Sequence, residues 1–321
     1  MNVETPSGTF AYRVEHETRY EYDTPVATSQ HAACLRPRDL PGQRLRWYRL
    51  HIDPEAADRT ARLDYFGNTV EQFSILGSHS RLLVHSSSLV EITPQPFYPA
   101  SASPPWEGVR DDFVYRKGAP GRPEAEFVFS SPIVPVEKLS REYGRESFWP
   151  GRPLLEAAED LMHRMYRDFT FDAEATTVST PVLRVLAERR GVCQDLAHVM
   201  ISCLRSLGLP ARYVSGYLLT DPPAGEERML GADASHAWVS VHCPGAGWVD
   251  LDPTNDVRPD HRHVVVGWGR DYGDVCPLRG AFVGGEEHSL EIAVSVIPLD
   301  AGQLERALGE ATSEPALGFP G

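Results

Sequence analysis

The first 93 residues alternate between apolar and polar positions, a pattern that is typical of half-buried β-strands. The alternation is clearest over residues 9–14, 45–52, 82–85 and 88–92. Residues 62–73 predict a hairpin that turns at Gly67 and Asn68. Several short strands at this spacing predict an all-β, sandwich-like N-terminal domain over residues 1–93.

The pattern changes after residue 93. Five prolines interrupt residues 94–112, which predicts a proline- and serine-rich linker. Beyond it, apolar positions follow a helical period from residue 154 to about 166, after Pro153, and again over residues 182–189. We expect an α+β core over residues 113–300 that includes a last strand at 289–297, followed by a tail at 301–321.

A further helix is predicted after residue 192, where apolar residues recur with a helical period. These residues are Leu196, Val199, Met200, Cys203, Leu204 and Leu207, and the pattern ends at Gly208. Cys193 would lie on the first turn, where unpaired backbone N–H groups and the helix dipole favour a thiolate. A buried structural cysteine is the alternative, because Cys193 shares the apolar stripe of Leu196 and Met200.

A hairpin is predicted over residues 235–252, with strands at 235–242 and 248–252. If its loop has three or five residues, Asp252 falls on the same face as His236, at the distance of a diagonal neighbour. A one-residue slip would place Asp252 on the other face, and a two-residue slip would favour Asp250 instead. Under the first condition, Asp252 can orient His236.

A thiol, an imidazole and a carboxylate together can catalyse acyl transfer. The thiolate attacks a carbonyl and forms a thioester, the imidazole transfers protons, and the carboxylate orients the imidazole. Cys193, His236 and Asp252 are therefore candidates for these three roles. The Cys193 backbone N–H would hold the oxyanion together with a second donor, for which Gln194 and Tyr166 are candidates.

Three segments carrying these residues resemble the transglutaminase-like superfamily, and more closely its bacterial members with a β-rich N-terminal region. The segments are GVCQD at 191–195, SHAW at 235–238 and GWVDLDPTN at 247–255. The resemblance extends over roughly residues 8–297 and implies a papain-like core in which Cys193 is the nucleophile, His236 the base and Asp252 the orienting residue. It favours an accessory role for the β-rich region, either as a recruiting module or as a wall of the cleft.

The resemblance leaves the acceptor of the acyl group open. Water would make the protein a cysteine peptidase or amidase, and an amine would make it a transglutaminase that forms isopeptide bonds. A catalytically silent binding module is the third possibility. In each case we expect a peptide or protein partner and no metal or organic cofactor.

Other residues near these motifs have simpler interpretations. Trp238 shares the face of His236 and is predicted to contact substrate, although a tryptophan in a strand usually belongs to the core. Tyr166 is a second candidate for contact with substrate. His198 is expected to pack near the site. His261 and His263 form a His-x-His pair near Asp260, which we interpret as a solvated loop rather than a metal site.

Composition narrows the partners and the compartment. The net charge of −14 argues against binding to nucleic acid or to an anionic membrane surface. The five cysteines are scattered without the spacing of a disulfide or zinc framework. The first residues show no basic and apolar leader, and no apolar run approaches the ~20 residues of a membrane span. We therefore expect a cytoplasmic enzyme.

Overall fold

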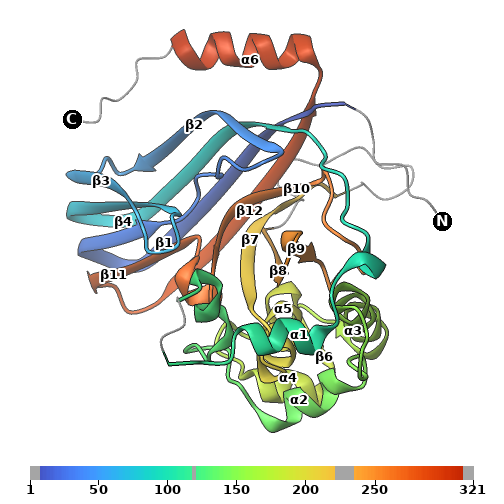
Figure 1. Ribbon diagram of the computed structural model, residues 1–321. Coiled ribbons are helices and arrows are strands. Elements are labelled where there is room, and N and C mark those ends of the chain that lie inside the picture. Colours follow the sequence, from blue (N-terminus) through green and yellow to red (C-terminus); the bar gives the residue numbers. More distant parts are fainter. Residues whose placement is uncertain (1–7, 118–120, 221–234, 314–321) are drawn as a thin grey trace.

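The computed structural model describes residues 8–117, 121–220 and 235–313 (Figure 1). Its main elements are a six-stranded sheet, a four-stranded sheet and a group of helices beside the smaller sheet. The α+β class is confirmed.

The larger sheet is antiparallel and is built on two long strands that pair with each other, β1 and β4. Its strands are β1 (Phe10–Ala33), β2 (Gln43–Asp53), β3 (Asp58–Leu63), β4 (Thr69–Ile92), β11 (Leu278–Gly284) and β12 (His288–Leu299). The predicted hairpin is present, because β3 pairs with β4 from Leu63 opposite Thr69. The separate strands predicted at 82–85 and 88–92 are both parts of β4, and the described residues before 94 form one sheet rather than two layers.

The last two strands return to this sheet. β11 and β12 both pair with β1, so the strand predicted at the end of the core belongs to the N-terminal sheet. Alternation along a strand shows which of its faces are buried but not which strand it pairs with. The following helix α6 (Ala301–Ser313) lies over the same sheet, where Leu304 and Ala307 pack against Leu89 (Figure 1). The predicted tail therefore begins with a packed helix.

The linker also contains packed structure. Its second half forms α1 (Trp106–Asp112), after the short helix η1 (Ala100–Ala102). Trp106 and Val109 are buried in the main core, and Trp106 Nε1 donates to the Trp149 carbonyl over 3.0 Å. Pro105 directly precedes this helix as its N-cap residue. A proline is compatible with the start of a helix, so the prolines of this segment do not prevent α1.

The smaller sheet has the order β10-β7-β8-β9 and is also antiparallel. Its strands are β7 (Ala211–Leu218), β8 (Ser235–Cys243), β9 (Gly247–Leu251) and β10 (His263–Gly269). The helices beside it are α2 (Lys138–Arg145), α3 (Leu154–Asp168), α4 (Val182–Glu188) and α5 (Cys193–Ser206). The remaining elements are the short helices η2 (Pro123–Val128) and η3 (Tyr272–Asp274) and the parallel pair β5 (Thr170–Phe171) and β6 (Arg190–Gly191).

The helix α5 is the centre of this core. Every residue from Asp195 to Ser206 is buried, since α5 contacts β7 and β8 on one side and α2, α3 and α4 on the other. The three predicted helices are present: α3 begins at Leu154 directly after Pro153, α4 begins at Val182, and α5 begins at Cys193. Burial on all sides fixes the position of Cys193 at the helix start.

Two side-chain amides join the N-terminal sheet to the core. Gln43 donates to the Val265 carbonyl and accepts from the Val265 N–H, both over 2.8 Å. Asn68 makes the same pair of bonds with Trp268, over 2.8 and 3.0 Å. Each amide thus hydrogen-bonds to one N–H and one C=O of β10, as the backbone of a neighbouring strand would. These backbone groups at the edge of β10 therefore have partners. Apolar side chains of β1 and β4 also pack against Tyr217, Val264 and Val266 of the smaller sheet.

In the part of the chain that the structure describes, none of the helices combines the length and the apolar character needed to cross a membrane.

Candidate active site

The side chain of Asp195 caps the start of α5. Asp195 Oδ2 accepts from the Val192 N–H over 2.9 Å and from Thr176 Oγ1 over 2.6 Å. Gly191 permits this close approach, because a Cβ there would lie 2.7 Å from Asp195 Oδ2. Cys193 follows as the first residue of the helix and is half-buried.

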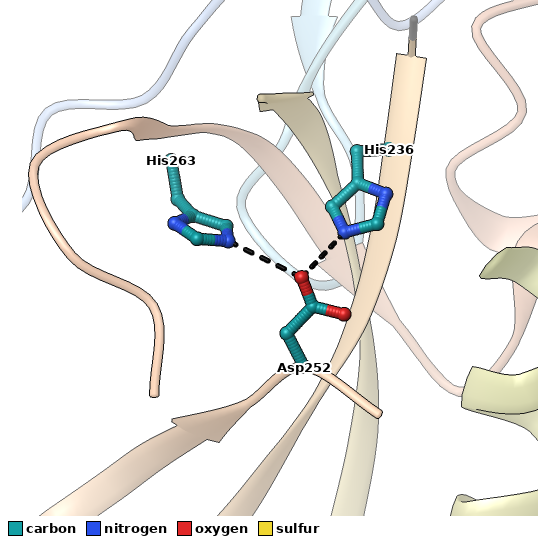
Figure 2. Close-up of side chains that lie close together, drawn as sticks. All are labelled: His236, Asp252 and His263. Atoms are coloured by element: carbon teal, nitrogen blue, oxygen red, sulfur yellow. Dashed lines mark hydrogen bonds and ion pairs between the residues drawn. The ribbon is translucent and has the colours of Figure 1, made fainter. Parts of the chain in front are cut away.

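The hairpin has the register that the sequence required. Cys243 pairs with Gly247 across a three-residue loop, and the ladder continues to Val239 opposite Leu251. His236 Nε2 donates to Asp252 Oδ2 over 2.7 Å (Figure 2). Asp250, the alternative, lies opposite Ser240 and accepts from Trp238 Nε1 over 3.1 Å. The predicted pairing of His236 with Asp252 is therefore present in the structure.

Asp252 is fully buried and surrounded by donors. Its Oδ1 accepts from the Thr254 N–H over 2.9 Å, and its Oδ2 accepts from Asn255 Nδ2 over 2.7 Å as well as from His236. Burial raises the pKa of this carboxyl, but the hydrogen bonds from His236, His263 and Asn255 outweigh it and hold the pKa well below its usual range. Asp252 therefore stays ionised at neutral pH.

His236 is shifted in the opposite direction. Burial lowers its pKa, but its hydrogen bonds to Asp252 and Cys193, and the charges of both groups, raise the pKa to about 10. The imidazolium form therefore dominates at neutral pH. Because Nε2 faces Asp252, Nδ1 is the ring nitrogen that remains for Cys193.

His263 is a second histidine on Asp252, and sequence reasoning missed it. Rather than lying in a solvated loop, it is buried at the start of β10, and its Nε2 lies 3.3 Å from Asp252 Oδ2 (Figure 2). Its Nδ1 lies 3.2 Å from the backbone nitrogen of Asp260 and 3.4 Å from Asp260 Oδ1. The apolar run 264–266 that follows was the available sequence signal for a strand. His261 lies outside this network and stacks on Phe10.

His236, Asp252 and His263 together form a cluster of the kind that can hold a metal ion. One donor atom each of His236, Asp252 and His263 lies within 4.8 Å of the others, as a metal site would need. However, both Nε2 atoms already hydrogen-bond to one carboxylate oxygen, and all three side chains are buried. Binding an ion through these atoms would break both hydrogen bonds, so the geometry fits an orienting network.

Cys193 and His236 line one pocket, with a cavity volume of about 230 Å³. The core supplies Val192, Gln194, Tyr213, Ser215, Ser235, Ala237, Tyr272 and Pro277 as further lining residues. The N-terminal sheet supplies His16, Thr18, Tyr20, Leu278, Leu290 and Ile292. The sheet is therefore a wall of the cleft, the second of the two roles considered for it. A separate hollow of about 330 Å³ around Arg62 and Arg270 shares none of these residues.

The other candidates lie elsewhere. Trp238 is fully buried beside Gly216, where a Cβ would approach its ring to 2.5 Å, and it does not line the pocket. Tyr166 is exposed on α3 and also lies outside the pocket lining. His198 is buried and accepts the Tyr272 N–H over 3.2 Å, as expected of a packing residue. Of the two candidates for the second oxyanion donor, Gln194 lines the pocket and Tyr166 does not.

Comparison with protein families agrees with this arrangement. Residues 144–253 match the transglutaminase-like superfamily, and residues 12–91 match the bacterial transglutaminase-like N-terminal region. The chain belongs to the transglutaminase-like superfamily. An uncharacterized protein of Mycobacterium tuberculosis is 44% identical over 306 residues, which are 93% of this chain and 96% of the relative.

Two further proteins are similar to this transglutaminase-like chain, one in part of its sequence and one in its fold. A protein-glutamine gamma-glutamyltransferase of Pseudomonas aeruginosa is 40% identical over 73 residues, which are 22% of this chain and 11% of that protein. The solved structure of a cysteine protease candidate from Cytophaga hutchinsonii has a TM-score of 0.72 at 17% identity and covers 92% of both chains. The latter shows a shared fold, consistent with the papain-like core.

Proposed function

We propose that this protein is a thiol enzyme that attacks the amide carbonyl of a peptide or protein through Cys193. The observation that carries the proposal is the hydrogen bond from His236 to Asp252, 2.7 Å long, beside a half-buried cysteine at a helix start. An imidazolium next to the thiol favours a thiolate, which is the nucleophilic form. Cys193 is thus the nucleophile, His236 the acid and base, and Asp252 the orienting residue.

The first half of the reaction breaks the amide. Cys193 Sγ adds to the carbonyl carbon, and the oxygen that becomes negative is held by the Cys193 N–H and a second donor, for which Gln194 is the candidate because it lines the pocket. His236 then gives its proton to the amine nitrogen, the carbon–nitrogen bond breaks, and the amine leaves. The acyl group remains on Cys193 as a thioester.

The second half transfers the acyl group to water. Neutral His236 takes a proton from a water molecule as its oxygen attacks the thioester carbonyl. The carbon–sulfur bond breaks, a carboxylic acid leaves, and the thiolate and imidazolium return. Asp252 stabilises the imidazolium at both stages and itself stays ionised. All five cysteines are free, which suits the reducing cytoplasm proposed as its compartment.

An amine acceptor is the second candidate. The local identity to a protein-glutamine gamma-glutamyltransferase favours it, since that name describes transfer of a glutamine acyl group. In this case a primary amine replaces water in the second half, and an isopeptide bond forms. The first half is unchanged.

One experiment separates these possibilities. The protein is incubated with a glutamine-containing peptide, with and without a primary amine, and ammonia and peptide masses are measured. Ammonia release without amine incorporation indicates a hydrolase, and incorporation indicates a transferase; both must disappear in Cys193→Ala. A peptide cleaved at its backbone would indicate a peptidase. If neither product nor an acid-trapped Cys193 thioester forms across a panel of peptides, the chain is a silent binding module and the proposal is wrong.

A further inference from the structure

One wall of the pocket that contains Cys193 is built from cross-strand pairs of the N-terminal sheet. In β1 and β12, Tyr20 pairs with Leu290 and Thr18 pairs with Ile292. All four side chains line the pocket that contains Cys193 and His236. Residues directly opposite in antiparallel strands point to the same face, so the wall is one continuous patch.

The outer part of this wall is apolar and open to solvent. Leu290 is 48% exposed and Ile292 is 54% exposed, although both border the pocket. Leu278 of β11 and Pro277 extend the same apolar surface. Covering such surface releases about 25 cal/mol for each Å² of apolar area removed from water. A bound apolar group would therefore gain affinity here.

The inner part is polar but uncharged. His16 is buried, with Nδ1 bonded to Tyr217 over 3.0 Å and Nε2 to Thr18 over 3.1 Å. Burial, and to a lesser degree the charge of His85, lowers its pKa to about 4, so the ring is neutral at pH 7. Its hydrogen-bonding atoms are already occupied, and it therefore offers no charge to a ligand.

Charged substrates find no counter-ion in this wall. Among the described residues that line the pocket there is no aspartate, glutamate, lysine or arginine. Selecting a lysine or glutamate side chain would require an opposite charge, since burying an unpaired charge is costly. The composition favours an uncharged, apolar occupant.

We propose that Tyr20, Leu290 and Ile292 form an apolar subsite that binds a bulky aromatic or branched aliphatic side chain of the acyl donor, next to the carbonyl that Cys193 attacks. The inference rests on the proposed function, because it assumes that Cys193 is the nucleophile. It adds the substrate class: peptides or acyl amides with an apolar residue beside the reactive amide.

Two alkylating reagents test the subsite without knowledge of the natural substrate. Rates of Cys193 modification by iodoacetamide and by N-benzyl iodoacetamide are measured by mass spectrometry, and each is divided by the rate with N-acetylcysteine. We expect the benzyl reagent to be favoured by about tenfold, the order expected for one apolar group in a pocket. In Ile292→Asn and in Leu290→Asn the preference should fall below about threefold.

The matched control is Val283→Asn. Val283 is 64% exposed on β11 of the same sheet but does not line the pocket, so this variant should keep the full preference. Asparagine adds no charge, and the ratio of two reagents in one variant cancels changes in the thiolate fraction. A ratio near one in the unaltered protein, or equal ratios in all three variants, would overturn the subsite. If Cys193 reacts with neither reagent faster than the other cysteines do, the proposed function fails first.

Discussion

His263 Nε2 lies 3.3 Å from Asp252 Oδ2, the same oxygen that accepts the hydrogen bond of His236. This contact makes His263 a positioning residue that acts through Asp252. Replacing it with phenylalanine removes one donor from a buried carboxylate, so we expect turnover to fall by roughly tenfold or more.

The pH profile separates this role from a structural one. The hydrogen bond from His263 helps to lower the pKa of Asp252, so its loss should raise that pKa and move the acid limb of the profile to higher pH. His263→Gln, which keeps a donor, should recover part of the activity. His261→Phe is the control, and an equal loss there would contradict the prediction.

Asp252→Asn tests the orienting carboxylate itself. The amide can no longer hold the His236 imidazolium, so turnover should fall by about two to four orders of magnitude while the fold is kept. Asp250→Asn should matter much less, because Asp250 bonds Trp238 and not His236. Steady-state kinetics and circular dichroism of both variants check this. Reversed effects would mean that Asp250 orients His236.

Cysteine reactivity should single out Cys193. Burial raises the pKa of both Cys34 and Cys203 to about 12, which keeps these thiols protonated and unreactive. Iodoacetamide at neutral pH should therefore modify Cys193 first, and His236→Gln should slow this reaction. Peptide mass mapping over time is the measurement. Faster labelling of Cys203, or of half-buried Cys276, would exclude Cys193 as the activated thiol.

Acid should destabilise the protein through His16. Its pKa in the folded state is about 4, below the ordinary 6.5, because burial disfavours the charged ring. The unfolded chain therefore binds the proton more readily, and stability falls as pH decreases from 6.5 to 4. We expect His16→Gln to reduce this loss by roughly 2–3 kcal/mol in denaturant titrations. His51→Gln, at an exposed position, should leave it unchanged.

Asn68 should be important for joining the sheet to the core. Asn68→Ala would leave the N–H and C=O of Trp268 without their side-chain partner, and buried unpaired groups cost about 1–3 kcal/mol each. Chemical denaturation should show a loss of about 2–4 kcal/mol. Gln72→Ala removes an exposed amide from β4 and serves as control. Equal stabilities of the two variants would contradict this account.

The sequence by itself determined the local parts of the candidate site. The start of α5 at Cys193 and the hairpin that brings His236 to Asp252 each lie within about twenty residues of chain, where helical period, loop length and strand parity fix the geometry. Together, the segments at 191–195, 235–238 and 247–255 also indicated the family, which the comparison with family models confirmed.

Tertiary structure alone decided which distant elements complete the pocket. Tyr20 and Leu290 are paired although 270 residues separate them in the sequence. The alternation of apolar and polar residues in β12 does not indicate that β1 is its partner. Parity placed Trp238 on the face of His236, but burial against Gly216 removed it from the pocket. His263 joins Asp252 only because β10 pairs with β7. Local patterns specify faces and periods, whereas long-range pairing depends on how whole sheets pack.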